Sequence, residues 1–140
     1  MKITKTYSTT AEAYFDSILT SLRADYKRST GKHLETNQQL TGLKYITSFG
    51  NKGTQQAEVE IVELIENQRY RAIISSNRGK QIITYDIDSL SPNQIRVNYE
   101  EIVEQTDFFT KWNYKLLSIL FRKSLQKKME AQLDFIFNKI

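Results

Sequence analysis

The sequence predicts an α+β protein in which a curved antiparallel sheet packs against a long C-terminal helix. Between residues 43 and 107, apolar and polar side chains alternate in short runs, which is typical of antiparallel strands. From Phe108 to Ile140, apolar residues recur every three or four positions with no proline or glycine between them. That spacing indicates an amphipathic helix of about 30 residues. It is the one element long enough to cover the apolar face of the sheet.

The first 31 residues predict a strand followed by a helix. Residues 2–7 alternate and form the expected strand. Thr9 and Glu12 have the spacing of a capping box, in which the Thr9 hydroxyl accepts from the Glu12 backbone N–H. Gly31 is the expected end of the helix, because glycine adopts the left-handed conformation without steric cost. The helix is expected to bury Ala11, Phe15, Ile18, Leu22 and Tyr26, with Tyr14 and Leu19 flanking them.

Five further strands are expected, separated by turns rich in glycine, asparagine and proline. Successive hairpins leave no room for crossover helices, so the strands form an antiparallel meander. In the second of the five, the inward parity changes from Ile61 to Val62, which predicts a β-bulge. The expected strands cover residues 43–49, 54–66, 69–76, 80–88 and 94–105.

Composition excludes several classes of protein. The 140 residues suit a single domain, and no apolar run exceeds three residues, so membrane insertion is not expected. There is no cysteine and no apolar secretory segment, which predicts a cytoplasmic protein without disulfides. The net charge is +4, with an acidic middle between two basic flanks. Such a division is more often a solvated surface than a site for an anionic partner.

Four tyrosines are the first candidate site residues. Tyr45, Tyr70, Tyr85 and Tyr99 have the inward parity of four different strands. Hydroxyl groups that converge in an apolar cavity would orient a small ligand. The alternative is that the four rings only pack in the core, with their hydroxyls at its rim.

Glu101 is the candidate for acid–base chemistry. Alternation along the last strand places it on the inner face after Tyr99. Burial in an apolar cavity would raise its pKa and suit it to act as a general acid or base. A bulge at Glu100 and Glu101, or pairing with an inward lysine or arginine, would remove that role.

The start of the long helix supplies the remaining candidates. Trp112 lies where the helix begins and would either close the mouth of a cavity or anchor the helix by packing. Leu116 and Leu120 point in a different direction from the later apolar residues, because the stripe drifts around the helix. They would contact strands other than those met by the second half.

Other site types are not expected. His33 is the one histidine and lies in a polar loop, so neither a metal site nor a Ser-His-Asp triad is predicted. No glycine-rich loop that would bind phosphates is present, and no cofactor is predicted. The basic residues Arg122, Lys123, Lys127 and Lys128 are distributed around the helix. They indicate a solvated face, and no nucleic-acid partner is expected.

Several segments resemble a bacterial family called domain of unknown function 3284. They are KITKTYSTTAEAYFD, STGK, SNRGKQIITYDI, VNYEE and WNYKLLSILFRKS, distributed over nearly the whole chain. The family lies within the START/Bet v 1-like superfamily (SRPBCC), whose helix-grip fold wraps an antiparallel sheet of about six strands around a C-terminal helix. The resemblance implies a cavity between sheet and helix. It implies no catalytic residues, and the superfamily ranges over hydrophobic-ligand binding, polyketide cyclisation and chaperone co-regulation.

Three functions follow as hypotheses. The preferred one is binding of a small hydrophobic or amphipathic ligand between the sheet and the C-terminal helix. The second is a protein-interaction or co-regulatory module with a collapsed cavity. The third is a cyclase-type enzyme with Glu101 as acid or base. A monomer and a dimer are equally compatible with the sequence.

Overall fold

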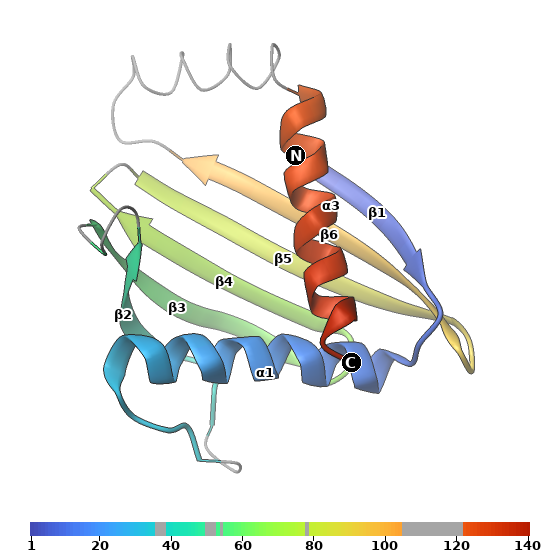
Figure 1. Cartoon of the computed structure of the whole chain (residues 1–140), viewed down its shortest axis with the longest axis horizontal. Helices are drawn as coiled ribbons and strands as arrows, with labels where there is room; N and C mark the ends of the chain where they lie inside the picture. The colour runs from blue at the N-terminus through green and yellow to red at the C-terminus, as the bar shows by residue number, and fades with distance from the viewer. Residues whose placement is uncertain (36–38, 50–52, 54, 78, 105–121) are drawn as a thin grey trace.

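In the described part of the chain, six antiparallel strands form one sheet, and two helices lie against it (Figure 1). The structure is a computed structural model that describes residues 1–35, 39–49, 53, 55–77, 79–104 and 122–140. The elements in chain order are β1 (Lys2–Tyr7), α1 (Ala11–Thr30), β2 (Lys44–Phe49), β3 (Gln55–Ile65), β4 (Arg69–Ser76), β5 (Gly79–Ser91), β6 (Gln94–Glu104) and α3 (Arg122–Asn138).

The order of strands in the sheet is β1-β6-β5-β4-β3-β2. Strands β2 to β6 follow one another as neighbours, so the predicted antiparallel meander is confirmed. β1 joins the far edge by pairing with β6, with Ile3 opposite Tyr99 and Tyr7 opposite Ile95. β5 continues to Ser91, three residues beyond its expected end, and turns through Pro92 and Asn93 into β6.

One face of the sheet, here called the inner face, forms the core with the two helices. α1 crosses the end of the sheet near β2, and α3 stands over β1 and β6 (Figure 1). α3 also packs against α1. The buried strand residues of the inner face are Ile3, Tyr7, Tyr45, Ala57, Val59, Ile61, Tyr70, Ala72, Tyr85, Ile87, Ile95, Val97 and Tyr99.

The predicted bulge lies in β3. Ile61 is opposite Ala72 in β4, whereas the next pair is Glu63 with Arg71, so Val62 is the extra residue. After the bulge Leu64 faces inward, opposite Tyr70, and packs against the core. The bulge therefore keeps an apolar residue on the inner face where strict alternation would have turned it outward.

The N-terminal cap of α1 is Thr10, and the predicted capping box based on Thr9 is wrong. The Thr10 hydroxyl accepts from the Ala13 backbone N–H at 3.1 Å. Thr10 has φ −99° and ψ 155°, so its backbone is extended and the helix begins one residue later than the capping box requires. At the other end, the prediction for Gly31 is confirmed. Gly31 has φ +72° and donates its N–H to the Lys27 carbonyl at 2.8 Å.

The buried side of α1 is centred differently from the prediction. Tyr14 was expected to flank the buried side, but it is fully buried, and Ser17 is buried beside it. Ala11 and Tyr26 are only half-buried. The reason is α3: the Tyr14 hydroxyl donates to the Leu133 carbonyl at 3.0 Å, and the Ser17 hydroxyl donates to the Ile136 carbonyl at 2.6 Å. The contact with α3 therefore places Tyr14 and Ser17 on the buried side of α1.

The structure describes the C-terminal helix from Arg122 to Asn138. The expected start at Phe108 falls within residues 105–121, which lie outside the described part of the chain. In α3, Met129, Leu133 and Ile136 are buried, as the apolar stripe predicts. Ile140 is 55% exposed, contrary to the stripe, because α3 ends at Asn138.

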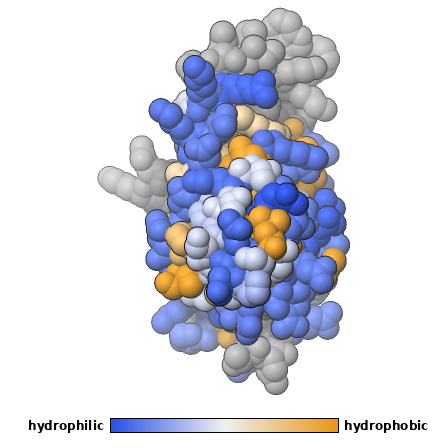
Figure 2. Space-filling model, turned by 90° about the vertical axis from the view of Figure 1, so that its right-hand side faces the viewer, coloured by the Kyte–Doolittle hydropathy of each residue, from blue (hydrophilic) through white to orange (hydrophobic). Residues whose placement is uncertain are grey.

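The surface seen from the side of β1 and α3 is mainly hydrophilic. Separate apolar patches interrupt it, and none extends across the whole face (Figure 2). Scattered exposed apolar residues of this kind are ordinary for a folded protein. Among the described helices, none is long and apolar enough to cross a membrane.

Candidate functional site on the inner face of the sheet

Three tyrosines of the central strands meet ring to ring on the inner face. Tyr70 of β4 is directly opposite Tyr85 of β5, which is directly opposite Tyr99 of β6. The ring centroids are 6.0 Å apart in the first pair and 4.7 Å apart in the second. All three side chains are buried. The predicted inward parity is therefore confirmed, and the three rings form a continuous aromatic row.

Tyr45 is also buried on the inner face, but it belongs to a contact with α1. Its ring meets Tyr26 edge to face, with centroids 5.2 Å apart. Its hydroxyl donates to the Asp25 carboxylate at 2.5 Å. Asp25 is held in place by an ion pair with Arg28 at 2.6 Å. Strand β3 separates β2 from the aromatic row. Tyr45 therefore lies beside the row, on the side next to α1.

The hydroxyls of the aromatic row differ in their partners. Tyr99 donates to the Glu101 carboxylate at 2.6 Å, and Tyr85 accepts from the Gln132 side-chain amide of α3 at 3.2 Å. The described residues thus hold the Tyr85 and Tyr99 hydroxyls in place by hydrogen bonds.

Burial keeps these phenols protonated. It raises the pKa of Tyr85 to about 12, and the nearby charge of Glu101 acts in the same direction. Burial likewise raises the pKa of Tyr70 above its ordinary value, with smaller contributions from Tyr85 and Asp25. Near neutral pH both groups are therefore neutral hydroxyls.

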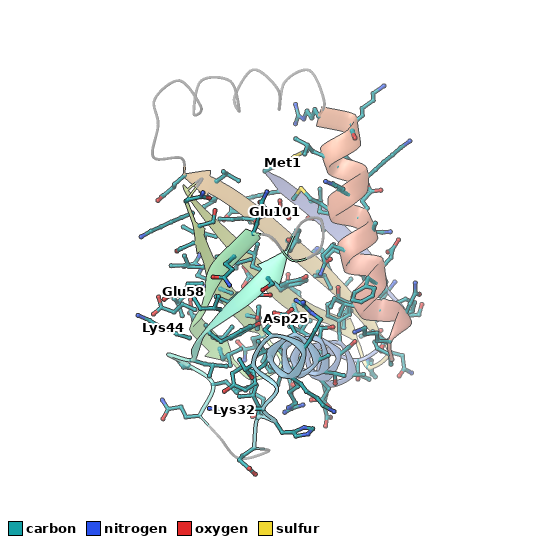
Figure 3. All side chains as sticks on the ribbon, turned by 60° about the vertical axis from the view of Figure 1, so that its left-hand side comes forward. Met1, Asp25, Lys32, Lys44, Glu58 and Glu101 are labelled. Carbon is teal, nitrogen blue, oxygen red and sulfur yellow. The ribbon has the colours of Figure 1, made fainter. Side chains whose placement is uncertain are left out.

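Glu101 lies on the inner face as predicted, and among the described residues neither of the two arrangements expected to remove its acid–base role is found. The register from Glu100 to Glu101 is continuous against β5, so there is no bulge at this point. No lysine or arginine of the described chain forms an ion pair with Glu101. Its carboxylate is half-buried and accepts from Tyr99. Figure 3 shows Glu101 near Met1 and well apart from Asp25, which lies on α1.

The remaining predicted site residues lie in the segment that the structure leaves undescribed. They are Trp112, Leu116 and Leu120. Their proposed contact with a ligand stays a prediction, and the described site consists of strand residues together with Gln132 of α3.

Sequence reasoning missed the polar residues that fix α3 over the sheet. Asp134 accepts from the Lys5 ammonium at 2.7 Å and from the Tyr7 hydroxyl at 2.6 Å. Gln132 reaches Tyr85, as described above. These side chains flank Leu133 on a helix whose periodicity predicts only its apolar face. Their partners are more than 40 positions away in the chain, so no local pattern indicates them.

The outer face of the sheet carries two open hollows, of about 490 Å³ and 190 Å³. Both are lined by Asp86 and Asn98, whose side chains point away from the core. Arg69, at the larger hollow, donates to Asp86 at 2.6 Å and lies 3.6 Å from Glu63. Its charge is already paired, so the described residues that line this hollow offer no free cation to an anionic ligand. Among the described residues, no group of three or more His, Asp or Glu is arranged to hold a metal ion.

Comparison with known proteins places the chain by sequence and by fold. The model of the family described as a domain of unknown function, DUF3284, matches residues 1–122. No curated protein matches the sequence. Among solved structures, the protein of unknown function SA2116 from Staphylococcus aureus is similar, with 16% identity and a TM-score of 0.63. That match covers 99% of this chain and 90% of that one.

Two further structures support the same fold. A protein from Arthrobacter aurescens has 12% identity and a TM-score of 0.62, covering 99% of this chain and 86% of its own. The Bet v 1-like protein Ara h 8.0201 has 10% identity and a TM-score of 0.57, covering 99% and 97%. At sequence identities this low, the structural similarity establishes the fold and leaves the function open. The chain therefore belongs to the DUF3284 family and has the helix-grip fold of Bet v 1-like proteins.

Proposed function

We propose that the protein binds a small hydrophobic or amphipathic molecule between the inner face of the sheet and the C-terminal helix. The observation that carries this proposal is the aromatic row of Tyr70, Tyr85 and Tyr99, which joins three adjacent strands. Aromatic walls with a few directed hydroxyls are the usual lining of small-molecule sites. α3 packs chiefly on β1, β6 and α1. The aromatic row therefore extends beyond the strands that α3 covers most closely.

The outer hollows fit this function less well. The larger hollow is lined mainly by polar residues, among them Arg69, Asp86 and Asp88. Arg69 is already hydrogen-bonded to Asp86, and Asp88 accepts from Asn98 at 3.0 Å. A hydrophobic ligand there would have to displace these interactions without replacing them, which costs affinity.

Glu101 supports binding better than catalysis. It is half-buried, and its carboxylate accepts from the Tyr99 hydroxyl, so the described residues do not isolate it in an apolar cavity. A general acid or base needs a proton donor or acceptor of the substrate within reach and a pKa suited to the reaction. The hydrogen bond at 2.6 Å occupies one carboxylate oxygen and orients the group. We assign Glu101 the role of fixing the position of the Tyr99 hydroxyl.

Ligand release and dye binding test the proposal together. Native mass spectrometry of the purified full chain should show a noncovalent small molecule that is lost on denaturation. After its removal, the uncharged dye Nile red should bind with one-to-one stoichiometry. Tyr85→Trp places a larger ring in the middle of the aromatic row and should weaken dye binding about tenfold, with the fold checked by thermal melting.

Asp88→Asn, in the larger outer hollow, is the matched control and should leave dye binding unchanged. If Asp88→Asn weakened binding while Tyr85→Trp did not, the ligand would lie on the outer face and the proposal would be wrong. Absence of both a bound molecule and saturable dye binding would favour the interaction module with a collapsed cavity.

A further inference from the structure

Three isoleucines form a row across the outer face of the sheet, here called the isoleucine row. Ile73 of β4 is directly opposite Ile82 of β5, which is directly opposite Ile102 of β6. Their chain neighbours Ile74 and Ile83 pack against the core, so the row itself points away from the core. Both described helices lie on the inner face (Figure 1), and Ile102 is 40% exposed. No described helix therefore covers the isoleucine row.

A second row, here called the charged row, runs beside the isoleucine row and two positions away from it along each strand. Direct register pairs continue it from β1 through β6, β5 and β4 to β3. In that order it consists of Lys2, Glu100, Thr84, Arg71 and Glu63. Its charges are positive, negative, neutral, positive and negative. From the opposite end every sign is exchanged, so the row is complementary to a reversed copy of itself.

Both rows are centred on β5, and this defines how a second copy of the chain would fit. A two-fold rotation about an axis along β5 places β4 of one copy face to face with β6 of the other. Ile82 then meets Ile82, and Ile73 meets Ile102. The same rotation places Arg71 opposite Glu100. Each of these unlike pairs occurs twice in a two-fold contact, and sheets that pack face to face have nearly aligned strands.

The cations of the charged row can pair with a second copy. Arg71 uses its Nε to donate to Thr84 at 3.1 Å, and its guanidinium lies 3.9 Å from the Glu63 carboxylate, beyond hydrogen-bond distance. The guanidinium has five N–H donors, so it can bind a further carboxylate. Lys2 lies 3.3 Å from Glu100, and its side chain is 78% exposed. Exclusion of water between two sheets would strengthen the attraction of both cations to carboxylates of the other copy.

We infer that the outer face of the sheet is the interface of a symmetric dimer, in which a second copy of this chain packs on the isoleucine row. The isoleucine row supplies the apolar contact, and the charged row fixes the orientation of the two copies. Asp86, the next outward residue of β5, would face its own copy near the axis. Its charge is already compensated by Arg69 at 2.6 Å. The inner face takes no part in this contact, so the dimer does not depend on the proposed ligand binding.

Sedimentation velocity of the purified full chain tests the dimer. The mass should rise from 16.4 kDa to twice that value between about 1 and about 500 µM, a range suited to a small interface. Ile102→Thr should raise the dimer dissociation constant at least about tenfold, because the apolar contact that it removes occurs twice. Ile46→Thr is the matched control and should leave the constant unchanged. Ile46 is 48% exposed, but it lies on the edge strand β2, which meets no described strand of the second copy.

Charge reversal tests the symmetry of the contact. Arg71→Glu and Glu100→Arg should each weaken dimerisation at least about tenfold, because each substitution places like charges opposite one another. A one-to-one mixture of the two variants should dimerise again, and so should the protein that carries both substitutions, since opposite charges then meet. Thermal melting checks that each variant is folded. If a charge variant does not fold, the comparison of Ile102→Thr with Ile46→Thr decides.

The outcomes that overturn the inference are specific. A chain that remains monomeric over the whole concentration range would overturn it, and the isoleucine row would then be a solvated surface or the site of a different protein. A dimer that Ile102→Thr and both charge reversals leave intact would also overturn it, because the contact would lie elsewhere. Folded single variants whose mixture fails to dimerise would contradict the two-fold pairing of Arg71 with Glu100.

Discussion

Asp134 connects the C-terminal helix to the first strand of the chain. It lies on α3 and accepts from Lys5 and Tyr7, both of β1. The Lys5 ammonium and the Tyr7 hydroxyl together lower the pKa of the Asp134 carboxyl below its ordinary value of 3.8. Burial raises the pKa of Tyr7, so its hydroxyl donates throughout this range. The three side chains therefore hold the second half of α3 to the edge strand.

Asp134→Asn should lower the stability of the folded protein at pH 7 and make that stability less sensitive to acid. The ionised carboxylate stabilises the fold above pH 3.8, and this contribution is lost as the pH falls through the lowered pKa of the folded state. We expect a loss of about 1 kcal/mol at pH 7, since the carboxylate is partly exposed and screened. Urea unfolding at pH 7 and pH 2.5 measures this loss of stability. Asp16→Asn, which changes an exposed carboxylate, is the control. If the substitution lowered the free energy of unfolding equally at both pH values, the result would contradict this account.

At the scale of the element, both ends of α1 show how local chemistry sets a helix boundary. Thr9 and Thr10 are chemically equivalent caps, and the sequence does not distinguish them. Thr10 is selected because the chain is extended at this residue as it leaves β1, so the helix starts at Ala11. At the C-terminal end, Gly31 has no competitor, and its left-handed backbone was predictable from its residue type.

Gly31→Ala should destabilise the protein through the backbone alone. A Cβ at this position meets no atom within 4 Å, so there is no steric clash with the rest of the fold. We expect the free energy of unfolding to fall by about 1 kcal/mol, because a residue with a side chain must adopt the left-handed conformation. Gly31→Asn should lose less, because asparagine tolerates this conformation better. Thermal melting ranks the three proteins, and equal stability of the alanine and glycine forms would contradict the left-handed backbone of Gly31, with φ +72°.

The whole molecule is built around the middle of its sheet. β5 lies between β4 and β6, and the aromatic row crosses these three strands. β2 is at an edge with one strand neighbour, and its outward side chain Ile46 is 48% exposed. The candidate site is therefore supported by the most completely hydrogen-bonded strands, which keeps its tyrosines in fixed positions.

Hydrogen exchange should follow this arrangement. Amides of Ile83 and Tyr85, in the centre of β5, are expected to exchange about a hundredfold more slowly than those of Lys44 to Phe49. The central amides open only with much of the sheet, whereas an edge strand opens locally. Exchange of backbone amides followed by NMR measures the difference. Equal protection of β2 and β5 would show that the sheet opens as one unit.

Sequence alone determined what depends on neighbours in the chain. Alternation identified all six strands and the inward parity of Tyr45, Tyr70, Tyr85, Tyr99 and Glu101. The loss of parity at Ile61 revealed the bulge, and the DUF3284 motifs indicated the fold. These signals are local because side-chain direction repeats every two residues in a strand and is set by the backbone there.

Only the tertiary structure decided which distant groups meet. Tyr14 and Ser17 are buried because carbonyls of α3 lie above them, and Tyr85 is bound by Gln132, 47 positions later in the chain. Such contacts depend on how elements cross, and a periodic pattern carries no information about the crossing. The same reason explains why the sequence identified Tyr85 as an inward tyrosine but not as the acceptor of the Gln132 amide. That contact depends on where α3 lies over the sheet.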